Sequence, residues 1–149
     1  MRAIIQRVSE ASVTVDSEIV SQIDRGALIF LGVSPTDSAT EISWLTKKIA
    51  NLRIFDDSEG TMNLSLIDVG GEALVVSQFT LMANTKKGNR PSYINAAKPE
   101  QAIPLYEAFV DSLEQELKKK VRTGIFGADM KIQLLNDGPV TITLDTENK

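Results

Sequence analysis

The stretch Asn136-Asp137-Gly138-Pro139-Val140-Thr141 separates two runs whose apolar residues recur at every second position, as in β-strands. These apolar residues are Met130, Ile132 and Leu134 before the stretch, and Val140, Ile142 and Leu144 after it. Asn, Asp and Gly favour turns because they tolerate left-handed backbone or bond to their own main chain. We therefore predict a β-hairpin. Residue preferences alone favour a trans Gly138–Pro139 bond, since most X-Pro bonds in folded proteins are trans.

The length and composition are those of one globular unit, and we take residues 1–149 as a single domain. Hydrophobic residues make up 42% of the chain and charged residues 24%, which is typical of soluble proteins. The longest apolar run, residues 27–33, is too short to span a bilayer, and the first residues lack the apolar segment of a signal peptide. We therefore expect a cytoplasmic protein.

The chain contains no histidine and no cysteine. This excludes a Ser-His-Asp or Cys-His site within the chain and removes the commonest zinc ligands. We expect neither a metal nor another cofactor, so an enzyme of this sequence must use carboxylates, lysines, backbone groups or its substrate. The net charge of −4 argues against broad nucleic-acid binding, although a local basic patch can override the total.

Runs rich in Ile and Val predict a β-sheet. The expected strands are residues 2–8, 11–15, 18–23, 27–33, 53–55, 62–67 and 73–81, together with the two arms of the hairpin. Because residues 27–33 are apolar without interruption, we expect them to form a central strand that is covered on both faces.

Two amphipathic helices are expected. Ser38-Ala39-Thr40-Glu41 is a capping box that opens the first helix. The second lies between Pro99 and about Lys120, and its apolar stripe is Leu105, Phe109, Leu113 and Leu117. Pro104 either kinks the second helix or marks its true start. Lys118 to Lys120 are expected in the last turn, where cations favour the helix dipole.

Polar side chains interrupt two of the expected strands. Ser77, Gln78 and Thr80 follow the apolar first half of 73–81, so this strand end either hydrogen-bonds internally or faces a cleft. Arg7 lies near the end of an apolar strand, and burial preferences predict that its charge reaches solvent along its stem.

The loop of residues 82–93 is the most basic non-helical part of the chain. It carries Lys86, Lys87 and Arg90, with Gly88 between them. These cations are either part of a solvated loop or contacts to nucleic-acid phosphates.

Several motifs, in their order along the chain, are together similar to those of one known family. They are Met1-Arg2-Ala3 with Gln6-Arg7-Val8, Asn51-Leu52-Arg53-Ile54-Phe55, Ser77-Gln78-Phe79-Thr80-Leu81, Arg90-Pro91-Ser92, Thr123-Gly124 with Phe126-Gly127-Ala128-Asp129-Met130, and Asn136 to Thr141. The sequence thus resembles the D-aminoacyl-tRNA deacylases nearly end to end. Tyr93 departs from the family, which more often has Phe there, at a position to which we assign no role.

The resemblance implies an α+β fold in which a compact, barrel-like sheet packs with two main helices, and it implies a homodimer. It implies a cis Gly138–Pro139 bond and insertion of this pair into the partner's pocket, beside Ser77 to Leu81. Arg7 is then similar to the residue that steadies the turn, which reverses the expectation from burial preferences. Substrate binding and rejection of L-amino acids would fall to Ser77, Arg7, Met130, Gly138 and Pro139.

The activity implied is hydrolysis of the ester between a D-amino acid and the terminal ribose of tRNA. Glycyl-tRNA, especially on tRNA for alanine, is expected to be cleaved as well, because glycine has no side chain to clash. We assign catalysis to Gln78, Phe79 and Thr80: the N–H groups of Phe79 and Thr80 hold the oxyanion, Gln78 shapes the pocket, and the ribose 2′-hydroxyl helps activate water. Thr80 as a covalent nucleophile is the competing hypothesis. Lys86, Lys87 and Arg90 are the expected tRNA contacts.

Two other classes of function stay open from the sequence. One is a small-molecule D-amino-ester hydrolase that ignores RNA. The other is a non-catalytic dimer that binds tRNA ends through the cations of the basic loop.

Overall fold

A computed structural model describes all 149 residues. Its strands are β1 (Arg2–Val15), β2 (Glu18–Ile23), β3 (Gly26–Gly32), β4 (Phe55–Asp56), β5 (Met62–Leu64), β6 (Glu72–Ser77), β7 (Arg122–Thr123) and β8 (Lys131–Asp145). The helices are α1 (Ala39–Ala50) and α2 (Pro99–Leu117), with 3₁₀ helices η1 (Phe79–Met82) and η2 (Thr146–Asn148). No helix is both long enough and apolar enough to cross a bilayer.

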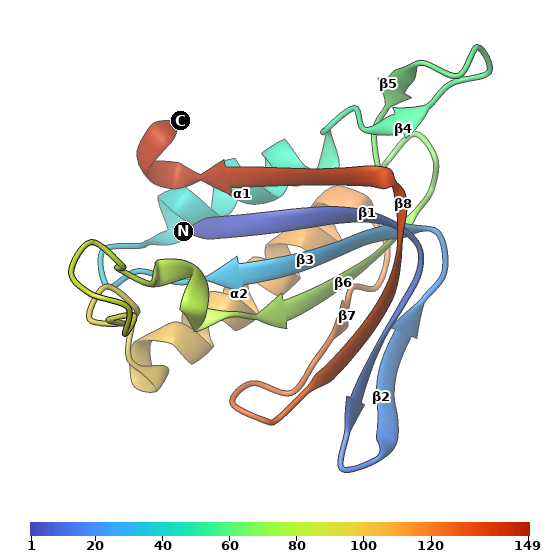
Figure 1. Cartoon of the computed structure of the whole chain (residues 1–149). Coiled ribbons are helices and arrows are strands. Elements are labelled where there is room, and N and C mark those ends of the chain that lie inside the picture. The colour runs from blue at the N-terminus through green and yellow to red at the C-terminus, as the bar shows by residue number, and fades with distance from the viewer.

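The main sheet has the strand order β2-β1-β3-β6-β7, and β8 pairs with β1. The first half of β1 lies against β3 and its second half against β2, while β8 follows both halves. β3, β6 and β7 run parallel to one another. The sheet curls so that β2 approaches β7, and Ser21 Oγ donates to Thr123 O across the closing side at 2.6 Å (Figure 1). This nearly closed sheet with two helices confirms the expected α+β fold.

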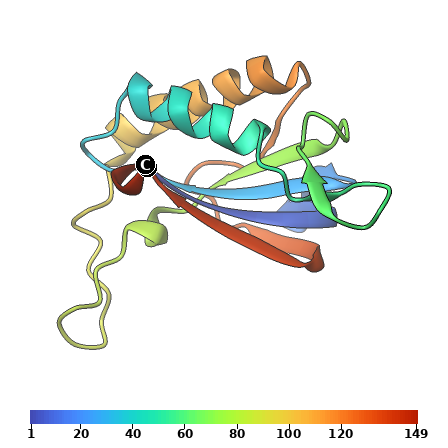
Figure 2. The ribbon, with the colours of Figure 1, turned by 90° about the horizontal axis from the view of Figure 1, so that it is seen from above.

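Both helices cover the same face of the sheet (Figure 2). The larger core lies between them and the sheet, where Leu45 of α1, Phe109 of α2 and Ile29 of β3 are fully buried. A smaller core lies inside the curl and includes Leu28 of β3 and Val8 of β1. Since β3 contributes alternate residues to the two cores, the prediction of a central strand covered on both faces is confirmed.

The capping box of α1 is present. Thr40 N donates to Ser38 Oγ at 3.2 Å, and Ser38 N donates to Glu41 Oε2 at 3.0 Å, so two free donors of the first turn are satisfied. Lys149 Nζ lies 3.1 Å from Glu41 Oε1. The Ser38 hydrogen bond, followed by the one from Lys149, lowers the pKa of Glu41 to about 2.

Helix α2 starts at Pro99, so Pro104 lies inside it and does not mark its start. The helix ends at Leu117, and Lys118 adopts the left-handed conformation with φ 51°. Lys118 to Lys120 therefore follow the helix, and their placement in its last turn was wrong. Burial of the apolar side of α2, at Tyr106 and Phe109 among others, holds the helix together despite the missing N–H of Pro104.

The predicted hairpin is wrong, because β8 is one strand that pairs with β1 along both arms. Thr141 lies opposite Gln6 and Asn136 opposite Val8, so residues 137–140 form a bulge that faces only Arg7. Alternation reports which side chains share a face, but it does not report which strand is the neighbour. The same limit explains β1, which continues through residues 9 and 10 with a shift of register where two strands were expected.

The bulge also moves β8 from one core to the other. Before it, Met130 and Ile132 pack against the smaller core, and after it, Val140, Ile142 and Leu144 pack against the larger one. The expected strands 53–55 and 62–67 are shorter, and as β4 and β5 they form a separate two-stranded sheet.

Candidate active site

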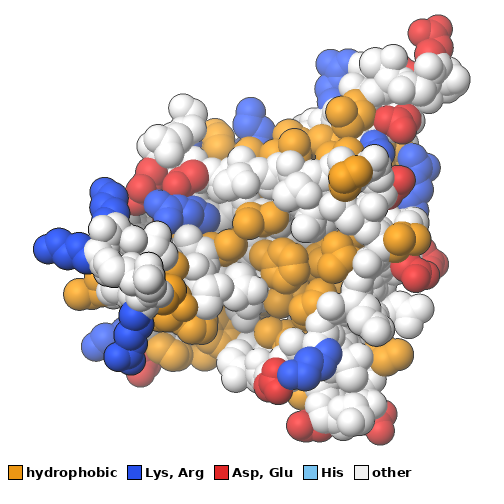
Figure 3. Space-filling model, viewed as in Figure 1, with side chains coloured by type: hydrophobic (Ala, Val, Ile, Leu, Met, Phe, Trp, Pro, Cys, Tyr) orange, Lys and Arg blue, Asp and Glu red, His pale blue; other side chains and the backbone are white.

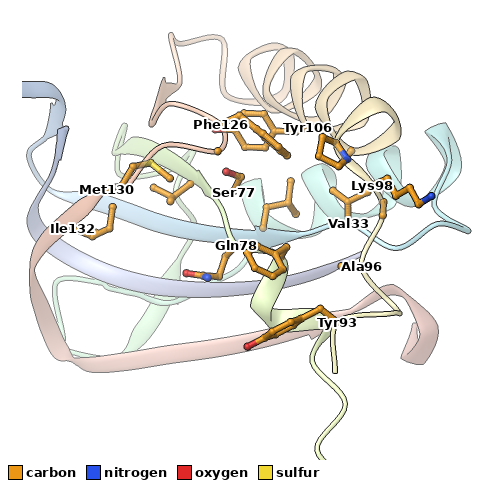
Figure 4. Close-up of a pocket in the computed structure, with 17 residues that line it drawn as sticks. Val33, Ser77, Gln78, Tyr93, Ala96, Lys98, Tyr106, Phe126, Met130 and Ile132 are labelled. Carbon is orange, nitrogen blue, oxygen red and sulfur yellow. The ribbon is translucent and has the colours of Figure 1, made fainter. Parts of the chain in front are cut away.

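A cavity of about 570 Å³ opens at the carboxyl end of β6 (Figure 4). Most of its lining is apolar. The lining combines Ser77, Gln78 and Phe79 with the connection that leads into α2, the Tyr106 side of α2, and the segment from Phe126 to Ile132. A largely apolar cavity with a few polar groups at one end is the usual form of a ligand site.

Strand β6 ends at Ser77, earlier than expected, and the chain turns into η1. Gln78 N donates to Leu31 O at 2.8 Å, which is the last bond that ties this segment to β3. The next two N–H groups, those of Phe79 and Thr80, donate to no acceptor within the chain. They are free because the first N–H groups of a helix have no partner in the preceding turn.

The polar side chains after β6 divide between the cavity and the surface. Ser77 and Gln78 line the cavity, whereas Thr80 is exposed and is not part of the lining. Gln78 Nε2 donates to Thr80 Oγ1 at 2.5 Å. The Thr80 hydroxyl therefore has an amide beside it, and an amide is not a base that takes a proton from an attacking hydroxyl.

An aromatic wall closes one side of the cavity. The rings of Tyr106 and Phe126 meet edge to face with centroids 5.7 Å apart. Tyr106 Oη donates to Val75 O at 2.8 Å, and burial raises the pKa of this phenol. Sequence reasoning missed Tyr106, because its neighbour Leu105 fits the apolar stripe of α2 and the phenol gives no signal of its own.

Met130 lines the same cavity and is positioned by a glycine. A Cβ atom on Gly124 would overlap the Sδ atom of Met130, and Gly124 N is tied to Val75 O at 3.2 Å. The Met130 side chain therefore occupies the space that any larger residue at position 124 would need.

The Gly138–Pro139 bond is cis, as the resemblance implies. Both residues are exposed at the bulge of β8, and neither lines the cavity of its own subunit. Gly138 has φ +124°, and a Cβ atom there would lie 2.9 Å from Arg7 Nη2. The backbone at this point therefore requires glycine.

Arg7 is 6% exposed, so the expectation that its charge reaches solvent was wrong. Its Nε donates to Asp137 O at 3.0 Å, and its Nη1 donates to Ile54 O at 2.7 Å and contacts Asp56 Oδ1 at 3.2 Å. Arg7 contacts the bulge from the opposite strand, as the resemblance implies. Its guanidinium fits there because residues 137–140 bulge away from the regular pairing with β1.

The cations of the basic loop project from the molecule beside the cavity. Lys86, Lys87 and Arg90 are exposed, form no ion pair and are not part of the lining. Figure 3 shows Lys and Arg side chains around this projecting loop and an apolar area in the middle of the same face. The same connection continues to Tyr93 and Lys98, which do line the cavity.

A family model described as D-Tyr-tRNA(Tyr) deacylase matches residues 4–145. The chain belongs to this family. A D-aminoacyl-tRNA deacylase of Flavobacterium psychrophilum is 63% identical over 149 residues, which cover 100% of this chain and 99% of that protein. One of Porphyromonas gingivalis is 62% identical with the same coverage. The match of the deacylase family to nearly the whole chain confirms the resemblance that its motifs carry.

Two solved structures share the deacylase fold of this chain. A c-Myc DNA unwinding element binding protein superposes with a TM-score of 0.93 at 42% identity, covering 98% of this chain and 99% of that one. A probable eukaryotic D-amino acid tRNA deacylase superposes with a TM-score of 0.82 at 18% identity, covering 96% and 97%. The second likeness concerns the fold alone.

Proposed function

We propose that the protein hydrolyses the ester that joins a D-amino acid to the 3′-terminal ribose of tRNA, in the cytoplasm. The observation that carries this proposal is the pair of free N–H groups, of Phe79 and Thr80, beside an apolar cavity that the chain itself leaves open. Two such donors suit the negative oxygen that develops when water attacks an ester carbonyl. The names of the full-length relatives support the same substrate.

The chemistry needs little beyond these donors. An aminoacyl ester is already reactive, and fixed geometry contributes up to about 7–11 kcal/mol while one oxyanion donor contributes about 3–4 kcal/mol. Gln78 shapes the site, and the ribose 2′-hydroxyl helps to activate the water. Thr80 is not the nucleophile in this proposal, because its hydroxyl lies outside the cavity lining and has only the Gln78 amide beside it.

Selection between mirror images requires a second subunit. Gly138 and Pro139 are exposed and lie outside the cavity of their own chain, which supports a role for them in the cavity of another copy. We infer a homodimer in which this pair enters the partner's site beside Ser77 and Met130. The two carbonyls receive the substrate ammonium and crowd the space of an L side chain, so L substrates are rejected by clash.

Glycine has no side chain to clash, so glycyl-tRNA, including glycine mischarged on tRNA for alanine, is also cleaved. The tRNA body is held through Lys86, Lys87 and Arg90. Since their contacts are to phosphates, binding weakens as salt is raised.

Deacylation of matched D- and L-tyrosyl-tRNA by the purified protein tests this proposal. Release of D-tyrosine with L-tyrosyl-tRNA left intact is the expected result, and equal rates on the two would contradict the selection by clash. Two further substrates, D-tyrosyl-adenosine and free D-tyrosine ethyl ester, are the controls. A small-molecule esterase that ignores RNA would cleave the two equally readily. A protein that binds tRNA without releasing any amino acid would be the non-catalytic dimer.

A further inference from the structure

We propose that Phe79 and Tyr93 form a stacking platform for the base of the nucleotide that precedes the terminal adenosine. This inference rests on the proposed function and adds a second nucleotide subsite to it. The two rings meet edge to face with centroids 5.0 Å apart at an angle of 72°. Phe79 is 57% exposed and Tyr93 40%, which is unusual for large aromatic side chains.

The position of this subsite follows from the covalent chain of the substrate. If the aminoacylated adenosine occupies the cavity, the preceding nucleotide is one phosphodiester away and must lie at the mouth. The side chains at the mouth are the exposed members of the lining, chiefly Phe79, Tyr93 and Lys98. Figure 4 shows Tyr93 at the rim, away from the Phe126 and Met130 side chains at the other side of the cavity.

The platform is held in place before any ligand arrives. Asn84 and Ser92 exchange two backbone hydrogen bonds, at 2.8 and 3.0 Å, which close the loop directly before Tyr93. Directly after it, Ala96 N donates to Tyr93 O at 3.0 Å and Ala97 N donates to Val33 O of the chain segment after β3 at 2.9 Å. Tyr93 is therefore anchored on both sides, although it belongs to a long connection.

The charges around the rings fit a single-stranded RNA end. Lys86, Lys87 and Arg90 of the loop and Lys98 at the mouth form no ion pair, so their charges are available for phosphates. Aromatic side chains that stack on bases, beside cations that follow the backbone, are the usual means of binding unpaired nucleotides. The platform should tolerate any base, because every base has a face that stacks.

The test pairs a change in the protein with a change in the RNA. The substrates are D-tyrosylated RNA 3′ ends in which the penultimate nucleotide is either intact or abasic, with its phosphate kept. For the native protein, removal of the base should lower kcat/KM about tenfold. Tyr93→Ala should lower kcat/KM about tenfold for the intact substrate and clearly less for the abasic one. Tyr93→Phe, which keeps the ring, should behave as the native protein does.

An equal loss on both substrates would overturn the platform, because Tyr93 would then contact the reacting end or the partner subunit. No loss from Tyr93→Ala on the intact substrate would overturn it as well. Binding of the same RNA ends without an amino acid separates this inference from the proposed activity. The protein could cleave neither of the two D-tyrosylated RNA ends and still bind the uncharged intact end more tightly than the abasic one. That result would refute the proposed deacylase activity and support the platform.

Discussion

Arg7 Nε lies 3.0 Å from the carbonyl oxygen of Asp137, the residue that precedes the exposed Gly138–Pro139 pair. The guanidinium is almost completely buried and also holds Ile54 O, so a single side chain fixes the bulge of β8 to the loop before β4. Removing a buried cation that makes several hydrogen bonds lowers the free energy of unfolding far more than removing one partner of an ion pair at the surface.

We expect Arg7→Met to destabilise the protein by about 2–3 kcal/mol, because the buried carbonyl oxygen of Ile54 and the partly buried one of Asp137 lose a charged donor. It should also reduce the preference for D- over L-tyrosyl-tRNA, because the bulge is no longer held. Arg2→Met is the matched control, since Arg2 is on the same strand and pairs with Asp145 but its side chain is 34% exposed. Urea unfolding should show a loss below about 1 kcal/mol for this control. Similar losses for the two variants would contradict the role of Arg7.

Gly138→Ala should cost about 2–4 kcal/mol, because it combines an unfavourable positive φ with a contact of 2.9 Å to Arg7 Nη2. Gly60→Ala separates the two effects, since Gly60 has φ +78° with no atom within 4 Å of the added Cβ. The Gly60 variant should lose about 1–2 kcal/mol and keep its discrimination against L-tyrosyl-tRNA. If Gly138→Ala retained full discrimination, the exposed pair would not select the substrate.

Thr80→Val should retain kcat within about threefold, because it removes the hydroxyl and leaves the backbone N–H in place. Loss of a covalent nucleophile would instead lower kcat by about 10⁴-fold or more. Single-turnover deacylation of D-tyrosyl-tRNA distinguishes the two. A substrate that ends in 2′-deoxyadenosine, charged at its 3′-hydroxyl, provides the complementary measurement, and it should react slowly if the ribose activates water.

Gly124→Ala should raise KM about tenfold with little change in kcat, because the added Cβ pushes Met130 into the cavity. The side chain of Met130 is flexible, so the fold should tolerate the change. Gly124→Ala combined with Met130→Ala should restore KM toward that of Met130→Ala alone. If the double variant were as impaired as Gly124→Ala, the effect would not pass through Met130.

The low pKa of Glu41 predicts that the free energy of unfolding depends on pH in the acidic range. Hydrogen bonds from Ser38 and Lys149 lower this pKa from its ordinary value of 4.5 to about 2. A carboxyl whose pKa is lower in the folded state stabilises the fold above the unfolded value and loses this contribution as the pH falls toward the folded value. The difference in unfolding free energy between the native protein and Glu41→Gln should therefore be constant near neutrality and shrink between pH 4.5 and 2. A difference that stayed constant down to pH 2 would contradict the assignment.

Local patterns in the sequence predicted local structure well. Ser38 and Glu41 predicted the start of α1 at the correct position, because a capping box involves only residues that are close together in the chain. The apolar run that became β3 was recognised as central, since only a strand covered on both sides has no need of polar residues. The polar residues after Val76 left two alternatives open, and the structure corresponds to the one that faces a cleft, although β6 ends at Ser77 and does not continue to Leu81.

Features that depend on distant partners were not predictable from the residues alone. Whether Arg7 is exposed depends on the bulge of β8, which is more than a hundred residues away in the chain. Tyr106 enters the site because α2 lies over β6, and nothing in its neighbourhood in the sequence reports that packing. The contact of Arg7 with the bulge was predicted only from the resemblance to the family. Burial preferences alone predict an arginine whose charge reaches solvent.

Because β8 pairs with β1 on both sides of the bulge, the length of the bulge is constrained as well as its residues. If an insertion or deletion between Asn136 and Thr141 made one arm slip by one residue along β1, the inward and outward positions of that whole arm would be reversed, since neighbouring residues of a strand point to opposite faces. Ile142 and Leu144 would then turn away from the helices, and Thr141 and Thr143 would face them. Changes in the length of this segment should therefore be rare among folded variants, in addition to the requirement for glycine at position 138.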